Sequence, residues 1–146
     1  MGFSWWAKPP VSEILKEILR RDEGVRFKPY RDTVGKLTIG VGRNLDDKGL
    51  SPAEVEFMLD NDIAEVRSQA AAFHWFANLN AARQAVVLSM LFNLGFAGFL
   101  KFQRTIAAIE SGRYADAATY MLESKWAGQV GQRAVRLAEM MRTGVV

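Results

Sequence analysis

Hydrophobic positions recur every three to four residues along most of the chain, which is the spacing of helices that pack on one face. The first such stripe lies in residues 11–23 and ends before Gly24, where a C-terminal cap glycine belongs. Over residues 27–41 the pattern changes to β-branched and aromatic residues with interspersed glycines. Residues 34–36, Val-Gly-Lys, have the composition of a turn, so this stretch predicts two short strands.

The rest of the chain predicts helices. Ser51, Pro52 and Glu54 form a capping box with proline at the first helical position, and the helix they begin is expected to reach about Ala72. Asn80 is the expected N-cap of another helix. That helix ends at Gly95, and three more are expected over residues 100–109, 114–122 and 133–141, broken at Gly112, Gly128 and Gly131. Strands near the N-terminus followed by a helical bulk predict an α+β fold that is mostly α.

Composition fits one folded domain without covalent staples. The chain has 146 residues, of which 49% are hydrophobic and 24% charged, and it has no cysteine. A disulfide framework and a thiolate zinc site are therefore excluded. The formal charge is +3, with positive surpluses in residues 16–43 and 101–146 and a negative surplus in residues 44–100. A positive surface suits a polyanion, which could be nucleic acid or an anionic cell wall.

The N-terminal stretch MGFSWWAKPP does not have the basic start and apolar core of a signal peptide. Residues 1–12 are expected to be an extension, and residues 13–146 a single domain whose β-lobe covers about residues 25–50. The apolar runs look too short to span a membrane, so no stable membrane insertion is expected, and the protein is expected to be a monomer.

Several classes of enzyme site are excluded by residue type. His74 is the only histidine, which excludes sites that need two, including the HExxH zinc motif. The chain has no GxSxG nucleophile motif and no GxxxxGK[ST] phosphate loop. Neither a metal nor a cofactor is expected.

Carboxylates remain as candidate catalytic groups. Glu23 ends the first helix, and Asp32 follows nine residues later at the predicted turn. Glycoside hydrolysis needs two acids in unlike settings, one protonated by virtue of a raised pKa and one ionised. Spacing alone does not distinguish a catalytic role from a structural one, because helix ends often carry acids and aspartate favours turns.

A wider pattern joins these residues. Its motifs are Arg21-Asp22-Glu23-Gly24, Tyr30-Arg31-Asp32-Thr33, Leu37-Thr38-Ile39-Gly40-Val41-Gly42, Met90-Leu91-Phe92-Asn93-Leu94-Gly95, Lys125-Trp126 and Arg142-Thr143-Gly144. In this order and spacing they resemble the phage lysozymes of the bacteriophage T4 type, a family of muramidases. The resemblance covers residues 13–144 and includes the Glu-x8-Asp-x5-Thr spacing.

The resemblance implies a lysozyme-like fold with a small N-terminal β-hairpin lobe and a larger helical lobe. It implies hydrolysis of the β-1,4 bond between N-acetylmuramic acid and N-acetylglucosamine in peptidoglycan, by an endolysin without a cofactor. The family roles fall on Glu23 as proton donor, Asp32 opposite it, and Thr38 as a residue that holds the attacking water. The resemblance also suggests inversion at the anomeric carbon.

By the same resemblance, substrate-binding positions fall on Asn44, Phe92, Thr105 and Tyr120, and Arg133 matches an arginine that approaches the catalytic glutamate. An arginine there would favour the ionised acid, so burial would have to outweigh it. Two departures stand out. Arg43 follows the glycine-rich strand where the best-known member has histidine, and residues 44–50 form a short connection that could reduce the lower lip of the cleft.

Three alternatives are open. A lytic transglycosylase would use Glu23 alone and release an anhydro sugar, whereas Asp32 and Thr38 are both retained here. A non-catalytic cell-wall-binding or structural phage module would not need all three residues. Nucleic acid is not expected as a partner, because no interleaved basic and aromatic motif is present. The protein is expected in the cytoplasm of an infected or lysogenic bacterium, reaching the wall with help from another protein.

Overall fold

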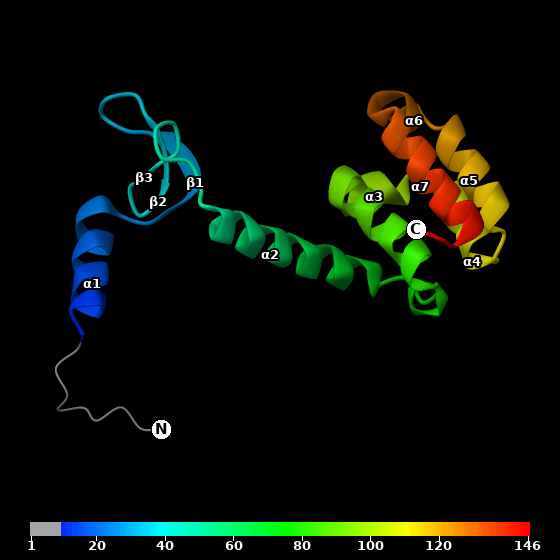
Figure 1. The fold of residues 1–146 in the computed structure, drawn as a ribbon, viewed down its shortest axis with the longest axis horizontal. Helices are drawn as coiled ribbons and strands as arrows, with labels where there is room; N and C mark the ends of the chain where they lie inside the picture. Colours follow the sequence, from blue (N-terminus) through cyan, green and yellow to red (C-terminus); the bar gives the residue numbers. More distant parts are fainter. Residues whose placement is uncertain (1–9) are drawn as a thin grey trace, which may run out of the picture. The chain divides into compact units, whose positions relative to one another are not determined.

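A computed structural model describes residues 10–146, so most of the expected N-terminal extension lies outside the described residues. The chain divides into an N-terminal unit, up to Val55, and a C-terminal unit, Glu56–Val146. Figure 1 draws both units. Helices outnumber strands, and the strands lie together near the N-terminus, which confirms the expected α+β, mostly α class.

The N-terminal unit consists of a helix followed by a small sheet. Helix α1 (Val11–Glu23) ends at Gly24, whose φ of 76° fits the predicted cap. Strands β1 (Arg26–Arg31), β2 (Leu37–Gly40) and β3 (Arg43–Asn44) form an antiparallel sheet in that order. The two predicted strands and the turn between them are confirmed. The third strand has only two residues, too few for the alternating pattern that identifies a strand in a sequence.

Helix α2 (Pro52–Ala70) begins with the predicted capping box. The backbone N–H of Ser51 donates to Glu54 Oε1 at 2.9 Å, and the N–H of Glu54 donates to Ser51 Oγ at 3.2 Å. Two N–H groups that lack a partner within the helix are satisfied in this way. The predicted start of the helix is therefore confirmed, and its end lies two residues before the expected position.

The C-terminal unit is helical and contains the main core. Its elements after α2 are η1 (Phe76–Asn78), α3 (Ala81–Leu100), α4 (Gln103–Glu110), α5 (Tyr114–Glu123), α6 (Lys125–Val130) and α7 (Gln132–Thr143). The largest side chains that are almost completely buried come from four of these helices: Val86, Val87, Met90, Leu91 and Phe99 on α3, Ile109 on α4, Met121 on α5 and Met141 on α7. Helix α3 thus supplies most of these large buried side chains.

Helix α3 corrects one sequence expectation. Its length and a mean hydropathy of 1.4 would suffice to cross a membrane, whereas the apolar runs looked too short for that. Five of its apolar side chains, Val86, Val87, Met90, Leu91 and Phe99, are buried in the core of the C-terminal unit. Gly95, with φ 73° and ψ 167°, departs from helical geometry within α3, where the first helical stretch was predicted to end.

The predicted breaks near the C-terminus are partly wrong. Gly128 lies inside helix α6, which was not predicted, whereas Gly112 and Gly131 lie between helices. Ser124 precedes α6, and its side chain accepts a hydrogen bond from the N–H of Ala127. Leu100, expected to begin the next helix, is the last residue of α3.

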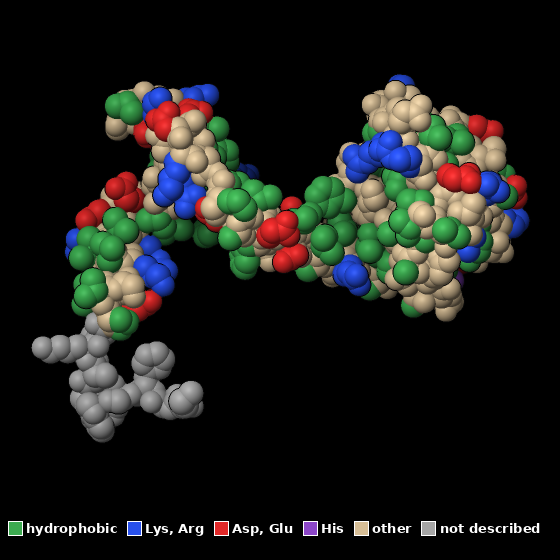
Figure 2. All heavy atoms as spheres, viewed as in Figure 1, with side chains coloured by type: hydrophobic (Ala, Val, Ile, Leu, Met, Phe, Trp, Pro, Cys, Tyr) green, Lys and Arg blue, Asp and Glu red, His purple; other side chains and the backbone are tan. Residues whose placement is uncertain are grey.

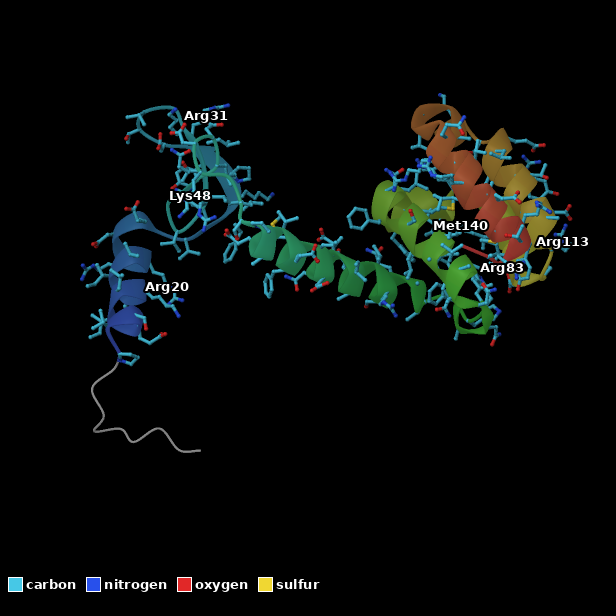
Figure 3. All side chains as sticks on the ribbon, in the orientation of Figure 1. Arg20, Arg31, Lys48, Arg83, Arg113 and Met140 are labelled. Atoms are coloured by element: carbon cyan, nitrogen blue, oxygen red, sulfur yellow. The ribbon has the colours of Figure 1, made fainter. Side chains whose placement is uncertain are left out.

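Arg83 ties the end of helix α7 to the start of α3. Its Nε donates to the carbonyl of Met141 at 2.8 Å, and its Nη2 donates to the carbonyl of Arg142 at 3.1 Å. The guanidinium also lies over the ring of Tyr114, 3.7 Å from its centroid. Figure 3 labels Arg83 at this place. The last carbonyls of a helix have no partner within it, so Arg83 satisfies groups that would otherwise need water.

Candidate active site

Glu23 is placed by the end of helix α1 and by a glycine of the sheet. A Cβ atom added to Gly42 would lie 2.9 Å from Glu23 Oε2 and 3.1 Å from its Cδ. The carboxyl group of Glu23 therefore rests against the backbone between β2 and β3. Gly42 also has φ 66°, a conformation that other residues rarely adopt. Only glycine meets both conditions without moving the carboxyl group.

Asp32 follows strand β1 and is held by the turn it begins. Its Oδ1 accepts hydrogen bonds from the N–H groups of Val34 at 3.0 Å and Lys36 at 2.8 Å. The backbone closes the same turn, because the N–H of Gly35 donates to the carbonyl of Asp32 at 3.0 Å. This is the turn chemistry for which aspartate is favoured. It fixes one oxygen and leaves Oδ2 without a hydrogen-bond donor among the described residues.

Thr38 lies on β2 and is the most buried polar residue of the N-terminal unit, with 3% of its surface exposed. Its backbone pairs with Tyr30 on one side and Asn44 on the other. Its hydroxyl donates to the carbonyl of Lys36 at 2.9 Å. Because the single hydroxyl hydrogen is used in this bond, the oxygen is left as an acceptor toward any further partner.

The peptide groups of Lys36 connect Asp32 with Thr38. The N–H of Lys36 donates to Asp32 Oδ1, while its carbonyl accepts from the Thr38 hydroxyl and from the N–H of Asp32, the latter at 2.9 Å. Two predicted site residues are thereby brought together through one intervening residue. The role of Lys36 could not be predicted from its residue type, since its backbone rather than its side chain makes these contacts.

Two aspartates after β3 hold this segment and were also missed. Asp46 Oδ2 accepts from the N–H of Leu37 at 2.8 Å, and Asp47 Oδ1 pairs with Lys36 Nζ at 3.0 Å. The bond from Lys36 lowers the pKa of Asp47, and the bond to Asp47 raises the pKa of Lys36. Figure 2 shows acidic and basic side chains side by side over the strands. Closely spaced Asn and Asp residues after a strand are the signal that could have revealed this turn.

Asn44 is engaged inside the same turn. Its Nδ2 donates to Asp47 Oδ2 at 3.0 Å, and its Oδ1 accepts from the N–H of Asp47 at 2.9 Å. Both ends of the amide thus have partners within the turn. Its assignment to substrate binding stays a prediction, and the structure gives it a turn-forming role.

Arg43, the departure from the family histidine, pairs with the helix cap. Its Nη1 lies 2.7 Å from Glu54 Oε2 and also donates to the carbonyl of Gly49 at 3.2 Å. The hydrogen bond from Arg43, helped by those from Ser51, lowers the pKa of Glu54 to about 2. An arginine–glutamate pair therefore joins β3 to the start of α2.

The C-terminal unit holds the remaining predicted residues. Thr105, 2% exposed, and the half-buried Tyr120 line one cavity of about 470 Å³. The buried Trp126 lines it too, and its Nε1 donates to Asn93 Oδ1 at 2.8 Å. Arg104, which lines the same cavity, lies over the Tyr120 ring, 4.5 Å from the centroid. Thr105 and Tyr120 thus line one cavity, and their assignment to substrate binding stays a prediction.

Phe92 and Arg133 lie apart from that cavity. Phe92, 48% exposed, lines a second cavity of about 280 Å³ with Gln69, whose Oε1 is buried without a hydrogen-bond partner. Arg133 Nη2 reaches Ser89 Oγ at 3.5 Å. Since Arg133 and Glu23 belong to different units, their approach stays a prediction. Among residues 10–146, no group of three or more potential metal ligands occurs.

Comparison with known proteins identifies the family of this chain. The model of the family described as phage lysozyme matches residues 20–140, a range that includes Glu23, Asp32 and Thr38. A "Probable T4-type lysozyme 2" of Dictyostelium discoideum is 25% identical, over 90% of this chain and 95% of that protein. A "SAR-endolysin" of Escherichia phage Mu is 28% identical, over 86% of this chain and 78% of that protein.

The chain belongs to the phage lysozyme family, and the expected lysozyme-like fold is confirmed. It is accordingly a hydrolase of the lysozyme and endolysin type. The "Pre-baseplate central spike protein Gp5" of Enterobacteria phage T4 is also similar, with 26% identity over 92% of this chain but only 30% of that protein. The same domain type thus occurs within a larger phage protein.

Proposed function

We propose that this protein hydrolyses the β-1,4 bond between N-acetylmuramic acid and N-acetylglucosamine in peptidoglycan. Glu23 is the general acid, and Asp32 and Thr38 hold and activate the attacking water. The observation that supports this most directly is the common attachment of Asp32 and Thr38 to Lys36. It gives two oxygen acceptors a fixed relation to each other, as water-mediated chemistry requires.

The roles of Asp32 and Thr38 follow from the hydrogen-bond acceptor sites that their oxygens keep for a further partner. The hydroxyl of Thr38 donates to the Lys36 carbonyl, so its oxygen can accept one hydrogen of the water. The Oδ2 atom of Asp32 can accept the other hydrogen and remove that proton during attack. The water oxygen then forms a bond to the anomeric carbon, and a water held opposite the leaving group gives inversion.

Glu23 supplies the proton that the leaving group takes up. As the glycosidic C–O bond breaks, Glu23 transfers its proton to the departing oxygen. Glu23 is left as a carboxylate and Asp32 as a carboxylic acid, and exchange with solvent restores both. The contact of Glu23 with Gly42 limits the positions that the proton-donating group can take.

The test is hydrolysis of purified peptidoglycan by wild type, Glu23→Gln and Asp32→Asn. Each variant is expected to lose about 10²–10⁴-fold in kcat, the usual contribution of a general acid or base. Asp22→Asn, on the neighbouring exposed acid paired with Arg21, is the matched control and is expected to keep full activity. Full lytic activity in Glu23→Gln would refute the assignment. Product masses separate the alternative transglycosylase, whose anhydro product is lighter by one water.

Substrate binding by the C-terminal unit is part of the proposal. The cavity shared by Thr105 and Tyr120 has aromatic walls and polar edges, which suit the faces and hydroxyl groups of a sugar. Phe92 is proposed to offer an aromatic surface to another sugar, and Arg133 to approach Glu23. Thr105→Val and Phe92→Ala are expected to raise KM more than they lower kcat.

A second function is favoured by one comparison. Similarity to the T4 central spike protein supports a structural or wall-binding module in a phage particle. Such a module would bind peptidoglycan without reducing the turbidity of a cell-wall suspension, and Asp32→Asn would bind as well as wild type. Product formation by wild type decides between the two.

A further inference from the structure

We propose that Asp46 is a positioning residue for the water-activating pair, Asp32 and Thr38. The inference rests on the proposed function, because it assigns a role within the same reaction. It concerns the turn that begins at Leu45, directly after strand β3, and that is not among the motifs that carry the family resemblance.

The segment to be positioned is the backbone at Lys36 and Leu37. The Lys36 N–H holds the carboxylate of Asp32, and the Lys36 carbonyl holds the hydroxyl of Thr38. A shift of this backbone segment therefore moves both water-binding groups together. A displacement on the order of 1 Å can cost about a hundredfold in rate when reacting groups must align.

Asp46 is the side chain that holds this segment from the turn after β3. Its Oδ2 accepts from the N–H of Leu37 at 2.8 Å, directly after the carbonyl that binds Thr38. The N–H of Leu45 donates to the carbonyl of Leu37 at 2.7 Å. Residues 45 and 46 therefore bind both the N–H and the carbonyl of Leu37. Arg31 Nη1 lies 3.8 Å from Asp46 Oδ2 and keeps a cation near the carboxylate.

The neighbouring residues hold Asp46 in place. Asn44 closes the turn through both ends of its amide onto Asp47, and Asp47 pairs with Lys36 Nζ. This last pair is exposed, so it adds little by itself. Water can replace Asp46 as an acceptor for the Leu37 N–H, but a water molecule would not fix where that backbone lies. The expected effect is therefore on alignment rather than on folding.

The experiment compares Asp46→Ala with Asp46→Asn in the full chain, using kcat and KM on purified peptidoglycan. Asp46→Ala removes the acceptor and is expected to lower kcat about tenfold while KM stays within about twofold. Asp46→Asn loses the charge but keeps an acceptor oxygen, so it is expected to restore kcat to within about twofold of wild type. Should Asp46→Ala not fold, Asp46→Glu, which displaces the acceptor by one methylene, takes its place.

Amide hydrogen exchange of Lys36 and Leu37 is measured on the same variants and needs no substrate. Faster exchange at both amides in Asp46→Ala, with wild-type exchange in Asp46→Asn, supports the inference. Equal kcat in all three proteins, while Asp32→Asn is impaired, overturns it and leaves the proposed function standing. If Asp32→Asn is fully active, the proposed function fails. Unchanged amide exchange in Asp46→Ala also overturns the positioning role, whatever the activities.

Discussion

Replacing Gly42 by alanine should separate activity from stability. The new Cβ would lie 2.9 Å from Glu23 Oε2, 3.1 Å from Cδ and 3.2 Å from Cγ. The atoms nearest to it belong to the end of a flexible side chain, so the carboxyl group moves aside at small energetic cost. The proton-donating group is then displaced, although the fold around it is retained.

Gly40→Ala is the matched control. Gly40 has φ 69° and Gly42 has φ 66°, so alanine meets similar backbone strain at both positions, roughly 1–2 kcal/mol. At Gly40 the added Cβ has no atom within 4 Å. Both variants should therefore lose about the same stability, roughly 3 °C in Tm for each kcal/mol in a chain of this length.

Their activities should differ. We expect Gly42→Ala to lose about 10- to 100-fold in kcat on peptidoglycan, the loss typical of a misplaced catalytic group, and Gly40→Ala to stay within about twofold of wild type. Thermal unfolding and initial rates of turbidity loss measure the two quantities. Equal rates for the two variants at equal Tm would refute the argument that Gly42 positions Glu23.

Two further predictions concern stability. The pKa of Glu54 is lowered to about 2 by Arg43, so the Arg43–Glu54 pair stabilises the fold above pH 4.5, and this contribution disappears as the pH falls from 4.5 toward 2. The Glu54→Gln variant should therefore show a flatter dependence of Tm on pH over that range. A slope equal to that of wild type would contradict the stabilising role of the pair. Arg83→Met should cost about 2–3 kcal/mol, because two charge-assisted hydrogen bonds to the end of α7 are lost. Chemical denaturation measures the free energy of unfolding. Arg136→Met, the same change of residue at a position on α7, is the control.

Features whose partners lie close in sequence could be predicted. Ser51 and Glu54 satisfy each other within three residues, and the turn that Asp32 begins closes within four. The residue types at these short spacings were therefore enough to predict the helix cap and the turn. Helix α6 was not predicted although Ser124 caps it, because glycine, here Gly128, is a residue that often breaks a helix. A short helix that contains a glycine can be recognised only from how it packs, and the buried Trp126 provides that packing.

The candidate site was predictable in its residues but not in its geometry. The resemblance identified Glu23, Asp32 and Thr38, while local spacing gave no reason to join Glu23 with Gly42, nineteen positions away. The role of Lys36 depends on strand pairing and on backbone groups, which have no signature in side-chain type. Asp46 acts nine positions from Leu37, so its partner was equally hidden.

The two halves of the proposed site are positioned by different forces, and this has a kinetic consequence. Glu23 is limited on one side by the backbone at Gly42, whereas Asp32 and Thr38 are held by hydrogen bonds through Lys36. Proton donation matters less when the leaving group departs as a stable anion, but water activation matters for every substrate. A peptidoglycan fragment with a nitrophenol leaving group on the anomeric carbon of its N-acetylmuramic acid should therefore restore much of the rate lost in Gly42→Ala and little of that lost in Asp46→Ala. Equal restoration in both would mean that a single distortion of the sheet, rather than two separate positioning contacts, underlies both losses.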